Sequence, residues 1–181
     1  MAYQKLQSRE ALKVIPSNTV RIPDPTSAVN LISTTVAATD GVTMFQVAAN
    51  VGTVLTGTNT KFTEMNIKQG MIIYNGTGAE CYYVVSVDSD TQITVSAAVG
   101  GGASDYITIY EKPTIGCTLF VGTGGDIHVK MAEQGGNVTA ANTPANSTQI
   151  YKNIANGSFM PIQVIQVYVG DTTATDIIAM W

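Results

Sequence analysis

One glycine-rich stretch, residues 116–129, holds most of the side chains that could do chemistry. It contains the only histidine, His128, with Asp126 two residues before it and Cys117 near its start. Side chains two residues apart on a strand share a face, so Asp126 could orient His128 as a general base. Cys117 is a candidate nucleophile only if it lies on the paired strand. A strand histidine held by a hydrogen bond explains the same residues, and we expect no active site and no enzymatic activity here.

The glycines of this stretch also bear on phosphate binding. A phosphate-binding loop needs a following helix with free N–H groups, and usually a Lys and a Ser or Thr in the loop. Residues 127–131 instead alternate with period two, and no Gly-Lys-Ser/Thr sequence follows. The alternation on both sides of the glycines predicts a β-hairpin across residues 122–126.

Four aspartates, Asp88, Asp90, Asp171 and Asp176, form two close pairs in the sequence. Paired carboxylates suit Ca²⁺ binding or acid–base catalysis. Each of these residues stands beside turn residues, where Asp is favoured because its side chain hydrogen-bonds to nearby backbone. Turn chemistry is the preferred interpretation, and we expect no metal and no cofactor.

The composition favours an uncharged, rigid β protein. Only 12% of the residues are charged, and the formal net charge is −4. Thr and Val suit pleated surfaces, and no basic patch for direct nucleic-acid binding is present. No stretch of apolar residues is long enough to cross a membrane, and no signal peptide is recognisable, so synthesis in a cytoplasm is expected. Cys81 and Cys117 lack zinc-site spacing and predict two buried free thiols.

Regularly spaced apolar segments between residues 42 and 110 indicate a small all-β unit. Asn75-Gly76 is the strongest hairpin signal in the chain, and residues 88–90 form another turn. Five or six short strands at this spacing predict a compact barrel or sandwich. Pro113 then interrupts the strand pattern. The predicted fold is all-β, with small barrel or sandwich units: an extended N-terminal arm (1–40), a β domain (41–112) and a C-terminal β domain (113–181).

The N-terminal arm is predicted from its prolines and its apolar residues. Pro16, Pro23 and Pro25 prevent a long regular element. The region is nevertheless too apolar for a solvated tail, so we expect it to lie along its own β domain or a neighbouring subunit. The C-terminal tryptophan should be packed in a sheet or against another subunit. The candidate interface residues are Leu12, Val14, Ile15, Val20, Ile22 and Trp181.

The C-terminal strand over residues 161–169 has apolar side chains on both faces. Ile162 and Val164 face one way, while Ile165 and Val167 face the other. Such a strand needs cover on both sides. A turn at residues 170–173 and a short apolar segment follow it.

Several motifs in the first β domain resemble a small module repeated in tailed-bacteriophage virion proteins. The module has the pattern T-V-x-G-T-x-T-x-F, then G-D-x-I-x-Y, then V-x-S-V-x-S-D-T-x-L-T. Residues 53–62, 70–74 and 85–94 stand in those places, with Met71 where the pattern has Asp.

The C-terminal domain resembles phage structural proteins more closely. Residues 119–126, 159–164 and 170–181 are similar to the motifs L-Y-V-G-T-G-G-D, L-P-V-x-V and G-T-T-A-T-D-I-x-A-L-W. Asp171 lengthens the usual Gly-Thr-Thr turn by one residue. Residues 11–17 are similar to the opening of the same proteins.

The resemblance implies a bacteriophage virion structural protein. We expect a capsid decoration, or cement, protein that binds the outer surface of the head. Its partners would be the major capsid protein or other virion subunits. The protein is also expected to form a homo-oligomer, with a trimer favoured.

Two alternatives remain at this point. One is a structural component of the tail, neck or fibre base, because the first module recurs in such proteins. The other is a carbohydrate-binding module, which would use exposed aromatic side chains; the candidates are Tyr74, Tyr82, Tyr83 and Tyr106.

Overall fold

The structure is a computed structural model that divides the chain into two compact units. It describes residues 10–29, 44–57, 60–76, 78–100, 105–113, 115–132 and 148–181, with only the backbone described for residues 44–51. Unit 1 comprises Met1–Asn18 and Thr114–Trp181, and unit 2 comprises Thr19–Pro113. Within the described ranges every element is a strand except one short 3-10 helix, so the all-β class is confirmed.

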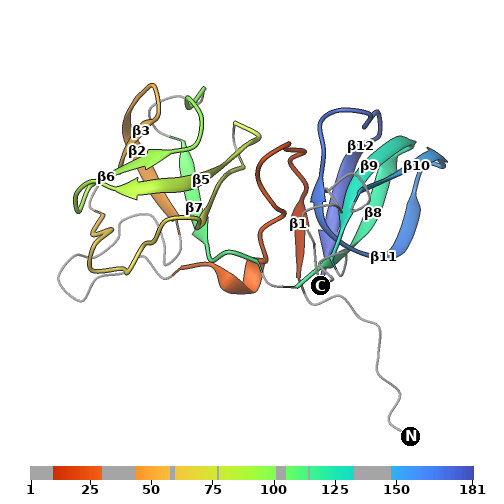
Figure 1. Ribbon diagram of the computed structural model, residues 1–181, viewed down its shortest axis with the longest axis horizontal. Coiled ribbons are helices and arrows are strands. Elements are labelled where there is room, and N and C mark those ends of the chain that lie inside the picture. Colours follow the sequence, from red (N-terminus) through yellow and green to blue (C-terminus); the bar gives the residue numbers. More distant parts are fainter. Residues whose placement is uncertain are drawn as a thin grey trace, which may run out of the picture. The chain divides into compact units, whose positions relative to one another are not determined.

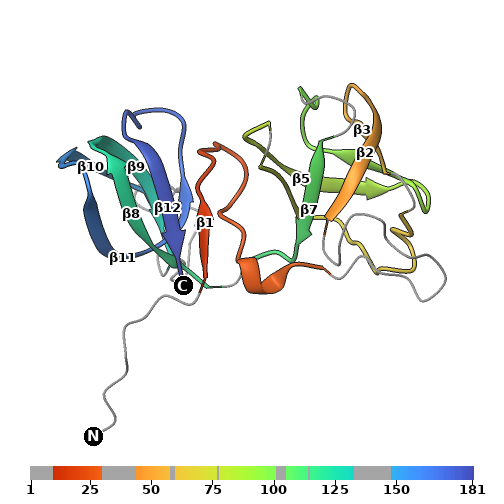
Figure 2. The ribbon, with the colours of Figure 1, turned by 180° about the vertical axis from the view of Figure 1, so that it is seen from behind.

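Unit 2 is a closed barrel of antiparallel strands in the order β2-β3-β6-β5-β4-β7 (Figure 1, Figure 2). Its strands are β2 (Met44–Val51), β3 (Val54–Gly57), β4 (Ile72–Asn75), β5 (Glu80–Val87), β6 (Gln92–Val95) and β7 (Tyr106–Tyr110). Closure pairs every wall strand on both sides, which removes free sheet edges. Of the two architectures expected for this region, barrel or sandwich, the structure has the barrel.

Alternation along β5 shows how the sequence forms the barrel wall. Tyr82 and Val84 are buried, whereas Tyr83 and Val85 are more than a third exposed. The long β3–β4 connection contributes Phe62, which is completely buried. The remaining core side chains are Leu55, Ile67, Ile73, Ile93, Val95, Ile107 and Ile109.

The predicted Asn75-Gly76 turn joins β4 to β5. Asn75 pairs with Glu80 across the hairpin. The Asn75 side chain is completely buried, yet its amide donates to the Asp105 carboxylate at 2.8 Å and its carbonyl accepts from the Gly78 N–H at 2.9 Å. A buried amide with both ends satisfied stabilises the turn, whereas an unsatisfied one would cost free energy.

Unit 1 is a six-stranded antiparallel sheet in the order β1-β12-β8-β11-β9-β10. Its strands are β1 (Ala11–Lys13), β8 (Cys117–Thr123), β9 (Gly125–Met131), β10 (Thr148–Ile154), β11 (Ser158–Val167) and β12 (Thr175–Met180). β11 lies between β8 and β9: Ser158 to Met160 pair with β8, Val164 pairs with Cys117 of β8 and Met131 of β9, and Gln166 and Val167 pair with β9. The register of β11 against β8 shifts between Met160 and Val164.

The hairpin predicted across residues 122–126 is wrong. Only Gly124 separates β8 from β9, yet β11 lies between the two strands in the sheet. Period-two alternation identifies strands, but it does not say which strands pair. The chain turns sharply at the glycines, and buried side chains on both strands, such as Val121 and Ile127, contribute to the interior.

Residues 10–18 form part of unit 1. β1 pairs antiparallel with the edge of β12, and the two strands run side by side in Figure 1 and Figure 2. The Ser17 N–H donates to the Val167 carbonyl at 2.8 Å, and the buried amide of Gln166 donates to the Ser17 carbonyl at 2.8 Å. This contact contributes to the cover expected for the C-terminal part of β11, where residues 164–167 are all buried.

Residues 19–29 belong to unit 2. Asp24 caps the 3-10 helix η1 (Pro25–Ser27), accepting the Thr26 N–H at 2.9 Å. The Val29 N–H then donates to the Ile109 carbonyl at 2.8 Å, so the segment joins the end of β7. Backbone groups that lie along a sheet need such partners, and they find them within this chain.

A single arm over residues 1–40 is therefore not what the structure shows. Its described parts, 10–18 and 19–29, are divided between the two units. Residues 1–9 and 30–40 lie outside the described residues. The units divide after Pro113, one residue beyond the expected start of the C-terminal domain at residue 113.

Removing residues 1–18 should loosen unit 1 and leave the barrel unchanged. The amide of Val169 donates to the Asn18 side chain at 3.1 Å, and β12 has β1 as its edge partner. In a chain that begins at Thr19, we expect these amides to exchange hydrogen about tenfold faster or more, because they lose their acceptors. Hydrogen-exchange mass spectrometry measures this, with peptides of β4 and β5 as the internal control. Equal acceleration in both units would contradict the assignment.

Candidate functional site

The glycine-rich stretch meets two other segments in unit 1, one of them from the 170–181 motif, and we call this junction, residues 122–126, 154–157 and 172–176, the glycine corner. The Gly124 N–H donates to the Asn156 side chain at 2.7 Å, and the Asp126 N–H donates to the Thr173 hydroxyl at 2.9 Å. These donors are used inside the chain. A phosphate-binding loop would instead direct such groups at an anion.

The corner requires glycine because backbones approach closely there. A Cβ added at Gly122 would lie 2.8 Å from the Cβ of Asp176 and 3.0 Å from its carbonyl oxygen. Asp176 itself has φ +53, a left-handed conformation, and its carboxylate accepts the Thr123 hydroxyl at 3.1 Å. The prediction that Asp176 stabilises a turn is wrong. The residue lies within β12, opposite Gly122 of β8.

His128 is held by the loop that precedes β12. Its Nδ1 lies 3.1 Å from the Gly170 carbonyl, its N–H donates to the Thr172 hydroxyl at 3.0 Å, and its ring stacks on Tyr168 at 4.6 Å. A carbonyl only accepts, so Nδ1 carries the proton in this contact. The interpretation of a strand histidine with a hydrogen bond is confirmed.

The structure does not bring the candidate nucleophile to His128. The Cys117 thiol is buried and donates to the Val164 carbonyl at 3.2 Å. The Asp126 carboxylate accepts the Asn153 N–H at 2.9 Å. These described contacts assign Cys117 and Asp126 to packing and turn formation.

The acidic pair of unit 2 stabilises a turn. Asp88 accepts the hydroxyls of Ser86 and Thr94, each at 2.7 Å, and these hydrogen bonds hold its pKa below the ordinary value. Asp90 forms a 3.0 Å ion pair with Lys61, which ties the turn to the β3–β4 connection. The described ranges contain no group of three or more His, Cys, Asp or Glu residues placed to hold a metal ion.

Three of the six predicted interface residues are buried within their own units, and the other three are half-buried. Val14, Val20 and Ile22 are 5%, 4% and 6% exposed, so they are core residues of their units. Leu12 and Ile15 are half-buried. Trp181 is also half-buried; its backbone N–H donates to the Glu10 carbonyl, and its indole Nε1 is buried without a hydrogen-bond partner among the described residues.

Sequence reasoning missed an apolar row on the outer face of unit 1. Neighbouring strands align Ile178, Phe120 and Phe159 across β12, β8 and β11, and we call these three residues the Phe159 row; Lys13 of β1 pairs with Ile178 at its end. Phe159 is 50% exposed, and Phe120 and Ile178 are partly exposed. Their chain neighbours Leu119 and Ala179 face the core, so alternation places this row outside. The signal in the sequence was a strand with apolar residues on both faces.

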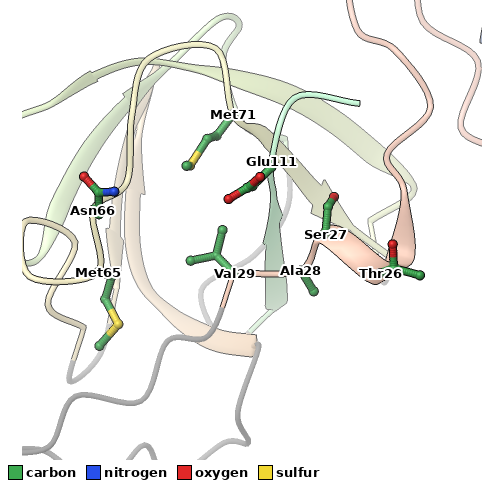
Figure 3. A pocket seen from close by; sticks show the side chains of 8 residues that line it. All are labelled: Thr26, Ser27, Ala28, Val29, Met65, Asn66, Met71 and Glu111. Atoms are coloured by element: carbon green, nitrogen blue, oxygen red, sulfur yellow. The ribbon is translucent and has the colours of Figure 1, made fainter. Parts of the chain in front are cut away.

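Unit 2 contains a hollow of about 420 Å³ beside the N-terminal segment (Figure 3). It is bordered by Val29, Met65 and Met71 on its apolar side, and by Ser27, Asn66 and Glu111 on its polar side. The Glu111 N–H donates to the Ser27 carbonyl at 3.0 Å, which fixes the strand end that positions its side chain.

The tyrosines proposed for sugar binding do not form a platform. Tyr74 and Tyr82 are buried, at 9% and 5% exposure. Tyr83 and Tyr106 are exposed but lie near opposite ends of β4, because Tyr83 pairs with Ile72 and Tyr106 precedes the partner of Asn75. Adjacent exposed rings, which sugar stacking needs, are not present among these four residues.

The comparisons with known proteins identify no relative. No protein family, no curated protein and no solved structure matches this chain. In the part of the chain that the structure describes, no helix is long and apolar enough to cross a membrane.

Replacing Gly122 with alanine should destabilise unit 1. The new methyl group would collide with the backbone and Cβ of Asp176, and overpacking of this kind costs about 1–3 kcal/mol. Gly170→Ala is the matched control, because a Cβ there meets nothing within 4 Å. Chemical denaturation monitored by Trp181 fluorescence measures both. Equal midpoints for the two variants would contradict the close approach at the corner.

Both thiols should be inert in the folded protein. Burial raises the pKa of Cys81 to about 12, and Cys117 is 1% exposed. Because the thiolate is the reactive form, we expect no reaction with a disulfide reagent such as DTNB at pH 8. The same reagent should titrate both thiols once the chain is unfolded in guanidinium chloride. Rapid reaction of either thiol in the native protein would contradict this assignment.

Proposed function

We propose that this protein is a structural component of a tailed-bacteriophage particle, specifically a capsid decoration protein bound to the outer surface of the head. The motif resemblance in both β units supports the proposal. The observation that carries it is the Phe159 row, an outward apolar row on a sheet whose opposite face is core. Exposed apolar rows of this kind are typical of surfaces that bind other proteins.

The mechanism is mechanical. Contact between the Phe159 row and a capsid surface would bury apolar area, which contributes about 25 cal/mol per Å² before the costs of association. Ile178 and Phe120 lie on strands paired on both sides, and Phe159 is paired with Phe120 of β8, so little conformational entropy is lost when they bind. Repeated over many copies, small contributions of this size reinforce a shell.

The residues first expected at the interface need a different role under this proposal. Val14, Val20 and Ile22 stabilise the units themselves, and the attachment surface moves to the outer face of β12, β8 and β11. A homo-oligomer, with a trimer favoured, would bring several such rows to one capsid position. The partner remains the major capsid protein or another virion subunit.

The decisive measurement is the copy number in purified particles. A decoration protein is expected in hundreds of copies, whereas a tail, neck or fibre-base component would be present in a dozen or fewer. Quantitative mass spectrometry against the major capsid protein provides this number. Absence of the chain from purified particles would exclude the proposal altogether.

The attachment surface can be tested by substitution. We expect Phe159→Ser to reduce occupancy on particles that lack the native protein about tenfold or more, because the exposed ring loses its apolar contact. Val169→Ser is the matched control: Val169 is 56% exposed in the same unit but lies outside the Phe159 row. Equal occupancy of both variants, measured by co-sedimentation, would remove the row from the attachment surface.

A further inference from the structure

The hollow in unit 2 combines acidic and apolar side chains, and the attachment proposal gives these residues no role. Figure 3 shows the Glu111 side chain directed into the space beside Met71 and Val29. Among the described residues, no cation and no hydrogen-bond donor contacts the Glu111 carboxylate. Within the described part of unit 2, the hollow therefore combines an exposed carboxylate that has no such partner with an apolar wall.

Local contacts hold the walls of this hollow in place. Met71 Sδ accepts the Lys68 N–H at 3.4 Å. Asn66 has φ +56, and its N–H donates to the Thr63 carbonyl at 3.2 Å, which sets the loop that carries Met65. Asn adopts this left-handed conformation more readily than most residues. The Val29 backbone is bonded to β7. The wall is thus formed before any partner arrives.

The charge of the chain is divided unequally between the units. Thr19–Pro113 contains eight acidic and four basic residues and so carries the whole formal net charge of −4, while the rest of the chain contains five of each. The field of unit 2 therefore attracts cations and disfavours acidic partners.

We propose that this hollow binds a basic side chain, arginine or lysine, of a partner protein. The charged end would pair with the Glu111 carboxylate. The aliphatic stem would lie along Val29, Met65 and Met71, as long basic side chains do on apolar surfaces. A volume of about 420 Å³ admits one such side chain without rearrangement of the walls.

The inference concerns unit 2 alone and does not rest on the phage assignment. Its test uses the isolated full-length chain, whereas the attachment proposal is tested on particles. Either can therefore fail without the other.

The probe is N-acetyl-L-arginine methylamide, titrated into the chain with ¹³C-labelled methionine methyl groups. We expect saturable shifts of the Met65 and Met71 methyl signals, assigned with Met65→Leu and Met71→Leu, at a dissociation constant on the order of 1–10 mM. The signals of Met160 and Met180, which lie in unit 1, should not move. Absence of saturable shifts at Met65 and Met71 would overturn the proposal.

Two controls separate charge recognition at Glu111 from other effects. Glu111→Gln should weaken binding about fivefold or more, because it removes the ion pair and keeps the shape. Glu64→Gln removes the same charge from an exposed position of the same unit and should leave binding unchanged. Unchanged melting temperatures would show that both variants are folded. Equal weakening by both substitutions, or equal binding of the neutral N-acetyl-L-citrulline methylamide, would refute recognition of a basic side chain by Glu111.

Discussion

Backbone-to-backbone approach at the glycine corner is the constraint on which unit 1 depends. Gly122 admits the backbone of Asp176, and Gly124 lies where a Cβ would meet the chain at Ala155 and Asn156. Only a glycine permits the β8–β9 connection to turn so sharply that β11 can insert between the two strands. The three segments of the glycine corner therefore stabilise one another, because their backbone groups and side chains form hydrogen bonds with each other.

Much of the fold could be predicted because its information is local. Alternation identified the strands on both sides of residues 122–126, and Asn75 and Asp88 marked real turns. The pairing of β8 could not be predicted in the same way. β8 pairs with β11 and β12, which lie dozens of residues away in the sequence. This pairing depends on close backbone approach and burial, which the periodicity of the sequence does not reveal.

The candidate surfaces were harder to predict than the fold. Val14 and Val20 were predicted to lie in an arm that binds another subunit, because they stand among prolines. The apolar character of such a segment does not show whether it packs on its own chain or on another, and both residues are buried. The exposure of Phe159 could not be predicted from the sequence, because its strand has apolar residues on both faces. The pairing with Phe120 shows which face of the sheet is uncovered. Glu111 directly follows the end of β7 and belongs to no recognisable sequence motif. Its place beside a hollow is visible only in the folded structure.

The two candidate surfaces, the Phe159 row and the hollow beside Glu111, differ in chemistry. The distribution of charge between the units explains why a chain with so few charged residues can have both. Unit 1 has balanced charge, and its apolar row gains free energy mainly by leaving water, which salt affects little. Unit 2 holds the net charge of the chain, and the exposed carboxylate of Glu111 stands beside an apolar wall, so its interactions with a charged partner depend on salt. A low overall charge leaves few competing ion pairs, so Glu111, whose carboxylate has no partner among the described residues, can select a partner by sign, while the Phe159 row contributes area without discrimination.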